Sequence, residues 1–348
     1  RHTRSYSVTV VQTCSLPISL DTWYLTSLLL PSAPHLARGL LENFIHVMEE
    51  SGFIDWKPGL AGQRSRYLAQ PFLAITAWQI HQTAPQPNWL EKIYPSLLRF
   101  LHHWFEDHDH DQNGYPEWDH ALQTGLEQAP IYDRWSPTGQ GVEIWALECP
   151  SLGAMLFQEC RCLSEIARLL KREQDLPWLT ARMSTLRQDI EQTWDEAAIT
   201  YRYQDTDTHC SPAGEELLQF QGSASFRIRR KFSPARRLQI LLYSQSSATQ
   251  MSLIRIHGNT PHGKVIEELG PRQFHWLQGL GRATSRNVFT TIERLEILQF
   301  HSEDTGILRT IDYTQEDISL LLPLWATIPD PPRAEKIKIG RASCRERV

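Results

Sequence analysis

The chain has 348 residues, 41% of them hydrophobic, and a formal net charge of −5. This length allows one large domain or two ordinary ones. The acidic balance argues against nucleic acid as a partner, because binding phosphates needs a clustered basic surface. No apolar run approaches the roughly 20 residues of a membrane helix, so we expect no membrane association.

Both ends of the chain differ from its interior. The C-terminal IGRASCRERV resembles the translation of a common sequencing adapter, and VTVVQTCSLPI near the start resembles that of the paired adapter. We therefore leave residues 1–18 and 340–348 out of fold reasoning, as segments that are not native. Four interior cysteines, which form no CxxC pair, then remain. They indicate reduced thiols and a cytoplasmic protein.

Helical periodicity dominates residues 19–210. The apolar stripes predict helices over 36–48, 67–81, 89–105, 151–171 and 177–194. Two long loops, 51–66 and 107–150, are rich in Trp, Asp, Gly and Pro. Because binding groups usually lie on ordered loops of a rigid scaffold, we expect the functional site there.

Residues 211–312 have a different texture, with alternating or β-branched apolar stretches such as FRIRRKF, LQILLYS and VFTTIERLEILQF. These stretches predict a β-rich insertion. The basic run Arg227–Lys231 fits an exposed strand face within it. Helical signals return over 313–339, with an acidic first turn. The predicted fold class is therefore mainly α with a β-rich insertion.

The segment DHDHDQNG at 107–114 places oxygen donors at alternate positions before a glycine, as a calcium loop does. The donors are Asp107, Asp109, Asp111 and Asn113. A twelve-residue loop counted from Asp109 would need Glu at position 120, where the chain has His. A hydrogen-bonded turn of Asp and Asn is the alternative. No cofactor is required by this pattern, and Ca²⁺ is the cation that it allows.

Several motifs occur in an order that resembles one known family. The chain reads NGYPEW, then Gln123-Thr-Gly-Leu-Glu127 and Tyr132-Asp133, after Asp21-Thr-Trp23 and Gln70-Pro71 and before Tyr313 and LLPLW. This set is similar to the signature of mannosylglycerate hydrolase-like glycoside hydrolases, which are related to glycoside hydrolase family 63 and to trehalases. The resemblance covers most of residues 20–333 and implies a partial (α/α)6 toroid, with one barrel part over 19–210 that resumes at 313–339.

The same resemblance assigns roles to individual residues. It places the general acid at Glu127, where the family has Asp, and it puts Gln123 where the family has Glu. It implies sugar contacts for a further set: Asp21, Trp23, Trp56, Gln70, Trp118, Gln123, Asp133 and Tyr313. The family's general base is a Glu on a later barrel segment, so we expect it outside these 348 residues.

The resulting hypothesis is a fragment of an inverting glycoside hydrolase that acts on an α-linked glucoside or mannoside. Inversion needs one protonated and one ionised carboxyl group on opposite sides of the sugar. Its expected partner is a small carbohydrate, of oligosaccharide or glycosylglycerate type, and the oligomeric state is not predicted. A non-catalytic carbohydrate-binding protein on the same helical barrel is the alternative, because Gln123 replaces a carboxylate.

Overall fold

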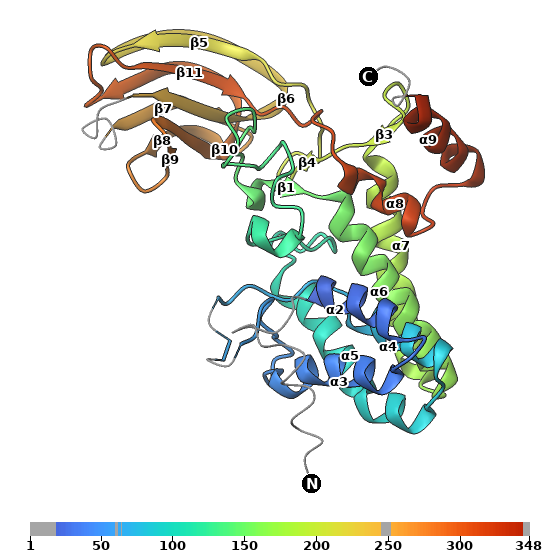
Figure 1. Ribbon diagram of the computed structural model, residues 1–348. Helices are drawn as coiled ribbons and strands as arrows, with labels where there is room; N and C mark the ends of the chain where they lie inside the picture. The colour runs from blue at the N-terminus through green and yellow to red at the C-terminus, as the bar shows by residue number, and fades with distance from the viewer. Residues whose placement is uncertain (1–18, 60–61, 64, 245–251, 344–348) are drawn as a thin grey trace. The chain divides into compact units, whose positions relative to one another are not determined.

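A computed structural model describes residues 19–59, 62–63, 65–244 and 252–343 (Figure 1). The adapter-like stretch 1–18 and the last five residues, 344–348, lie outside this part. The described residues form two compact units. The helical unit takes the described residues of Arg1–Gly125, Pro150–Tyr201 and Leu321–Val348, and the sheet unit takes those of Leu126–Cys149 and Arg202–Leu320.

The helical unit contains eight described α-helices, seven of which form two rows. Contacts between successive and alternate helices place α2, α4, α6 and α8 in one row, with α3, α5 and α7 beside them. The bounds are α2 Ser19–Leu29, α3 Pro34–Val47, α4 Leu73–Thr83, α5 Pro87–Asp107, α6 Pro150–Leu169, α7 Leu176–Gln192, α8 Leu322–Trp325 and α9 Pro331–Ser343. Among the described residues, no helix is both long enough and apolar enough to cross a membrane.

Helix α6 is the centre of the helical unit. Of its 20 residues, 16 are buried, and it packs against α4, α5, α7 and α8. A helix that is buried on nearly every side needs neighbours around it, which the two rows supply. Short elements complete the unit: the 3-10 helices Ala121–Thr124 (η1) and Glu173–Asp175 (η3), and the paired strands β2 Trp194–Asp195 and β3 Thr200–Tyr201.

Helix α4 begins later than the apolar stripe predicts. The sequence indicated a helix from residue 67, whereas the structure starts it at Leu73. Pro71 explains the difference, because a residue that precedes proline avoids the helical region and here Gln70 takes that position. The preceding Leu68 instead forms an isolated β-bridge with Asp55.

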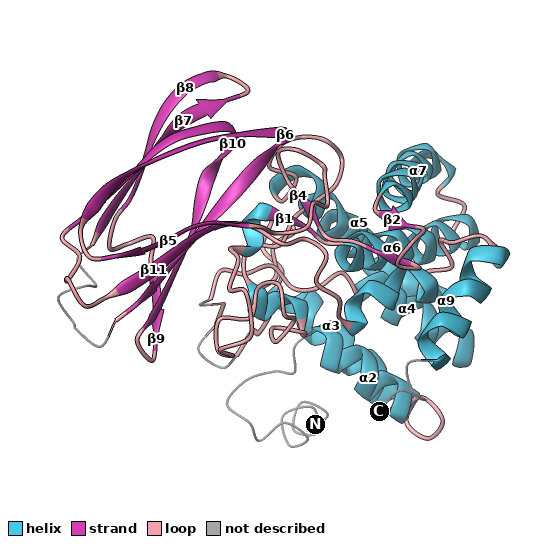
Figure 2. Ribbon diagram, turned by 90° about the horizontal axis from the view of Figure 1, so that it is seen from above, coloured by secondary structure: helices cyan, strands magenta, loops and turns pink. Residues whose placement is uncertain are grey.

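The sheet unit contains a seven-stranded antiparallel sheet, with its strands in magenta in Figure 2. The strand order is β5-β11-β6-β10-β7-β8, and β9 pairs with β10. The bounds are β5 Glu216–Gln221, β6 Ala224–Tyr243, β7 Leu253–Thr260, β8 Gly263–Leu269, β9 His275–Leu277, β10 Leu280–Leu298 and β11 Thr305–Thr310. All seven lie within the stretch predicted to be β-rich.

One set of sheet side chains forms an apolar core. It includes Leu238, Ile256, Phe289, Leu295 and Leu308, each fully buried. A core and sheet of this size correct the predicted fold class in one respect: the chain combines helices with a large sheet, so "mainly α" describes the helical unit alone.

The sheet unit also takes Leu126–Cys149, a segment that the sequence-based division left with the helices. The reason is local hydrogen bonding. The Gln140 amide donates to the Asp312 carbonyl at 2.6 Å, and the Arg282 guanidinium donates to the Arg134 carbonyl at 2.9 Å. This segment carries η2 (Ile144–Ala146) and β1 (Leu147–Glu148), and β1 pairs with β4 (Gln204–Asp205). The last short element is η5 (Ile318–Leu321).

Candidate active site

The acidic turn after α5 folds around its own carboxylates. Asp109 Oδ2 accepts a hydrogen bond from Gly114 N at 2.8 Å, and Asp111 Oδ1 accepts one from Asn113 N at 3.1 Å. Gly114 has φ +91°, a left-handed conformation that glycine adopts without strain. The predicted hydrogen-bonded turn of Asp and Asn is therefore present.

Three carboxylates of this turn also converge. One oxygen from each of Asp109, Asp111 and Glu117 lies within 4.8 Å of the other two. Asp109 Oδ1 is buried without a hydrogen-bond partner, and burial raises the pKa of this carboxyl group. A hard cation would satisfy that atom, because calcium binds clustered carboxylate oxygens.

The members of this cluster differ from the set predicted from sequence. Asp107 lies apart, because its carboxylate pairs with His103 Nδ1 at 2.6 Å. The side-chain oxygen of Asn113 accepts from Tyr115 N at 2.6 Å. Glu117 was missed as a member of this cluster because position 120 was tested for the closing Glu. The signal that could have identified Glu117 is the recurrence of acidic residues at positions 109, 111 and 117.

The histidines of the turn pair with Asp119. His108 Nδ1 lies 3.1 Å from Asp119 Oδ2, and His110 Nε2 lies 3.6 Å from Asp119 Oδ1. Burial of Asp119 opposes its ionisation, but these two histidines outweigh burial and lower the pKa of the carboxyl group. Asp119, which had no role in the sequence analysis, thus anchors both imidazoles.

Gln123 is fully buried and serves the backbone. Its Oε1 accepts from Asp119 N at 2.9 Å and from His120 N at 2.7 Å, while its Nε2 donates to the Leu68 carbonyl at 3.1 Å. His120 Nδ1 accepts from Leu122 N, so the side chains of His120 and Gln123 together cap the start of η1. The Gln123 amide therefore holds the loop in place, whatever contact with sugar it was predicted to make.

Gln70 presents an unused donor in the same unit. Its Oε1 accepts from Ser19 Oγ at 3.1 Å and from Leu20 N at 3.0 Å, but its buried Nε2 has no partner among the described residues. A side chain at Gly125 would approach this Nε2 to 3.0 Å, and Gly125 has φ +68°. Glycine is therefore needed there, and the unpartnered Nε2 of Gln70 stays fully buried. Asp21 is exposed on α2.

The predicted stacking tryptophans differ in accessibility. Trp118 is 1% exposed and packs against Trp104 at a ring distance of 5.5 Å, edge to face. Trp56 is half-buried, and Lys57 Nζ lies 5.9 Å from its ring centre. Trp118 is thus core, whereas Trp56 keeps some accessible surface.

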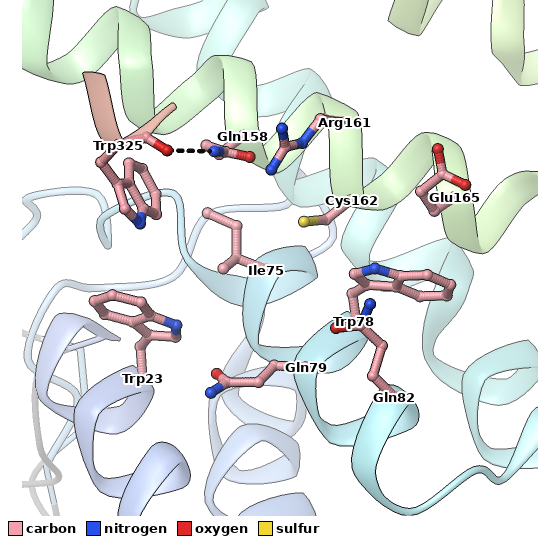
Figure 3. Close-up of a pocket in the computed structure, with 10 residues that line it drawn as sticks. All are labelled: Trp23, Ile75, Trp78, Gln79, Gln82, Gln158, Arg161, Cys162, Glu165 and Trp325. Atoms are coloured by element: carbon pink, nitrogen blue, oxygen red, sulfur yellow. Dashed lines mark hydrogen bonds between the residues drawn. The ribbon is translucent and has the colours of Figure 1, made fainter. Parts of the chain in front are cut away.

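Trp23 lines a cleft of about 440 Å³ in the helical unit (Figure 3). Helices α2, α4, α6 and α8 contribute its walls. The lining residues are Trp23, Ile75, Trp78, Gln79, Gln82, Gln158, Arg161, Cys162, Glu165 and Trp325. Trp23 stacks on Phe72 at 5.2 Å and meets Trp325 at 5.9 Å, and Gln158 Nε2 donates to the Trp325 carbonyl.

This cleft combines aromatic rings with amides, a guanidinium and a carboxylate. Such a lining suits a carbohydrate, because rings cover the apolar face of a sugar while amides and charges bond its hydroxyls. Sequence reasoning found Trp23 but missed Trp78 and Trp325. Those two lie more than 240 residues apart, on α4 and α8, so no local motif joins them.

Glu127 lies in the sheet unit, at the start of a tight turn. The Leu126 carbonyl accepts from Ala129 N at 3.0 Å and from the Tyr132 hydroxyl at 2.9 Å. The Glu127 side chain is half-buried, and none of the described residues of its unit hydrogen-bonds the carboxyl group. The turn is fixed while the carboxyl group is available.

Asp133 and Tyr313 are both engaged inside the sheet unit. Asp133 Oδ1 accepts from Trp135 N at 2.7 Å, and the Asp133 backbone leaves no room for a side chain at Gly139. The Tyr313 hydroxyl donates to Asp205 Oδ2 at 2.5 Å, and Tyr313 is 1% exposed. Burial raises the pKa of Tyr313 well above its ordinary value. Their predicted contacts with sugar stay predictions.

Comparison with known proteins gives one match of broad extent. The family model described as "Mannosylglycerate hydrolase MGH1-like glycoside hydrolase domain" matches residues 35–227. No curated protein matches the chain.

Solved structures are similar at low identity. A GH63 mannosylglycerate hydrolase from Thermus thermophilus in complex with glucose is 16% identical, with a TM-score of 0.47, over 58% of this chain and 66% of that one. The same enzyme with Tris and D-glycerate is 15% identical, with a TM-score of 0.46, over 58% and 68%. This chain thus spans 66% of the length of the first of these structures.

Proposed function

We propose, from the premise that this chain belongs to the mannosylglycerate hydrolase MGH1-like glycoside hydrolase family, that it forms part of an inverting enzyme that cleaves an α-linked glucoside or mannoside. The family match over 35–227 is the observation that carries this proposal, since that range includes Glu127 and its motif. The proposed fold is an (α/α)6 toroid to which the two rows of helices contribute, with the sheet as an insertion.

Glu127 is proposed as the general acid. A glycosidic oxygen is a poor leaving group, and a carboxylic acid that donates a proton to it lowers the barrier. The fixed turn and the unengaged carboxyl group of Glu127 support this role. Inversion also needs an ionised carboxylate that activates water, at roughly 6.5–9.5 Å from the acid. We propose that this base lies on a later segment, outside residues 1–348, as the family resemblance implies.

Two features of the helical unit are proposed to bind the sugar. The Nε2 of Gln70 is buried and unpartnered, so a sugar hydroxyl that reached it would gain a donor without displacing an existing hydrogen bond. Trp23 lines the aromatic cleft, where a ring can stack on a pyranose. A small carbohydrate, of oligosaccharide or glycosylglycerate type, fits this chemistry.

The test is Glu127→Gln in the full-length enzyme, because Gln keeps the shape of Glu and cannot donate an acidic proton. With an alkyl glycoside we expect kcat to fall by about 10²–10⁴. With a glycosyl fluoride, whose leaving group needs no proton, we expect a much smaller loss. The product anomer, followed by NMR during turnover, should be inverted. An equal loss on both substrates would remove Glu127 from the role of acid.

A non-catalytic carbohydrate-binding protein is the second candidate. It is favoured by Gln123, whose amide is used by the backbone at the position where the family resemblance expects a carboxylate. Calorimetric binding of an oligosaccharide without turnover by the full-length protein would support this candidate against the enzyme.

We also propose that Asp109, Asp111 and Glu117 bind Ca²⁺. The buried, unpartnered Asp109 oxygen supports the proposal, as does the preference of calcium for oxygen ligands. The ion would have a structural role, because the cluster follows α5 and the bound ion would order the loop that leads to Gln123.

A further inference from the structure

The sheet unit carries a second hollow that the proposed hydrolase does not use. It encloses about 430 Å³, within the range of ordinary ligand sites. Strands β6, β7, β8 and β10 contribute its lining, which consists of Arg227, Arg229, His257, Lys264, Glu293 and Arg294. Four of the six residues are cations and one is a carboxylate. We call this hollow the basic hollow.

The register of the sheet sets two arginines against each other. Arg294 on β10 lies directly opposite Arg227 on β6, and on its other side it lies opposite His257 on β7, whose Nε2 is 3.3 Å from Arg294 Nη2. Like charges in cross-strand positions destabilise a sheet. Glu296 offsets part of this charge, because its carboxylate lies 2.9 Å from Arg294 and 3.2 Å from His257.

Two of the cations have no counter-ion. Arg227 and Arg229 are exposed, and none of the described residues forms an ion pair or hydrogen bond with either. Lys264 reaches Glu293 only loosely, at 3.8 Å. Even with Glu296 included, the basic hollow holds four cations and two carboxylates. This surplus of positive charge is local, because the chain as a whole has a net charge of −5.

An irregularity in the strand pairing changes the direction of the side chains that line the basic hollow. Both ladders of β10 shift register between Ile292 and Arg294, next to Glu293. On β6, Ile228 and Arg229 have no register partner on β10, and Arg229 has a left-handed φ of 53°, which is uncommon for a residue other than glycine. A bulge of this type redirects a side chain, and glycine would adopt it more easily. The presence of Arg at this position therefore needs a reason other than backbone preference.

We propose that the basic hollow binds an oxyanion, a carboxylate or a sulfate, carried by an acidic glycan. Arginine forks bond planar or tetrahedral oxyanions through paired N–H groups. The hollow is larger than a single inorganic anion needs, so it leaves room for part of the sugar that carries the anion. The glycan part of this proposal rests on the proposed glycosidase function, whereas the anion part rests on the sheet alone.

Nucleic acid fits the basic hollow less well. Single strands are held by aromatic rings on which bases stack, and the lining contains no Phe, Tyr or Trp. The acidic chain would also repel a long polyanion outside the hollow. An acidic oligosaccharide of a few units presents its charge without that repulsion.

The test is titration calorimetry with four ligands of similar size, in the Glu127→Gln background so that hydrolysis does not interfere. They are tri-galacturonate, a sulfated trisaccharide, neutral cellotriose, whose β-links are not those of the proposed substrate, and a short single-stranded DNA. We expect at least one acidic trisaccharide to bind and cellotriose to bind at least about tenfold more weakly, because the oxyanion contacts are lost. The two acidic arms identify whether the anion is carboxylate or sulfate.

Variants decide whether the hollow is the site. Arg229→Gly should lose about tenfold in affinity while relieving the backbone, so that misfolding does not explain the loss. Arg227→Gln should act similarly. The control is Arg230→Gln, which neighbours Arg229 in sequence but pairs with Glu215 outside the hollow and should stay within about twofold.

The proposal is overturned if no acidic trisaccharide binds, if cellotriose or DNA binds as tightly, or if Arg230→Gln weakens binding as much as Arg229→Gly. None of these outcomes depends on turnover. Failure of the glycosidase proposal would appear separately, as unchanged kcat after Glu127→Gln.

Discussion

The side-chain amide of Gln123 donates to the backbone carbonyl of Leu68 at 3.1 Å, and both residues are fully buried. The bond joins η1 to the extended segment before α4, across 55 positions of sequence. A carboxylate at position 123 could accept the two backbone N–H groups that Gln123 accepts now. It could not donate to Leu68.

Gln123→Glu should therefore destabilise the protein. The ionised side chain would face the Leu68 carbonyl with no proton between two oxygens, at a cost of about 1–3 kcal/mol in the free energy of unfolding. Urea denaturation at pH 7 measures the change. Gln188→Glu, at an exposed position of α7, is the matched control and should change stability by less than about 0.5 kcal/mol. Equal effects of both substitutions would contradict the structural role of Gln123.

Glu159 makes the stability of the helical unit depend on pH. It is fully buried on α6, where its carboxyl oxygens accept from Ala74 N at 2.6 Å and from Ile75 N at 3.0 Å at the start of α4. Burial raises the pKa of Glu159 from 4.5 to about 7. The folded state therefore holds the proton more tightly than the unfolded state. The resulting stabilisation is full below pH 4.5 and is lost as pH rises towards 7 and beyond.

Glu159→Gln should remove that dependence. Between about pH 5 and 8 the wild-type protein should lose up to about 3 kcal/mol relative to the variant, from the pKa difference between folded and unfolded states. The Gln side chain can accept only one of the two backbone hydrogen bonds that Glu159 accepts, and this loss lowers the free energy of unfolding by the same amount at every pH. Chemical denaturation at several pH values gives the slope, and Glu173→Gln, at an exposed site, should keep the wild-type slope. Parallel slopes for wild type and Glu159→Gln would sink this prediction.

Calcium should stabilise the protein through Asp109. At a free concentration about 100 times Kd, a bound ion adds about 2.7 kcal/mol, which calorimetry in calcium and in chelator detects as a rise in Tm. Asp109→Asn should abolish the rise. Asp107→Asn should keep it, because Asp107 pairs with His103 outside the cluster. No rise in the wild-type protein, or its loss in Asp107→Asn alone, would refute the assignment.

Arg237 supports the sheet unit from within. Its guanidinium is fully buried and bonds Asp205 at 2.6 Å, while Asp207 and the ring of Trp145 also contact it. Arg237→Gln leaves the buried Asp205 carboxylate without its counter-ion, which typically costs about 3–5 kcal/mol. Thermal unfolding should show a much smaller loss for Arg230→Gln, whose pair with Glu215 is exposed. Similar losses for both variants would rule out a special role for the buried pair.

Local patterns were the reliable guide to secondary structure. The stripe that starts near Trp89 became α5, and the alternating stretches after residue 211 became the sheet, because 3.6-residue and two-residue periods reflect one buried face. The start of α4 was predicted six residues too early, since the effect of Pro71 on Gln70 was not weighed.

Side-chain roles were harder to predict, because they depend on partners far along the chain. The sequence by itself determined the family motif, the position of Glu127 within it and the acidic turn after α5. Only the tertiary structure decided that Gln123 bonds Leu68, that Glu117 rather than Asp107 joins the carboxylate cluster, and that Trp23 shares a cleft with Trp325. Each of these contacts depends on how helices, strands and loops pack, and local sequence periodicity carries no record of that packing.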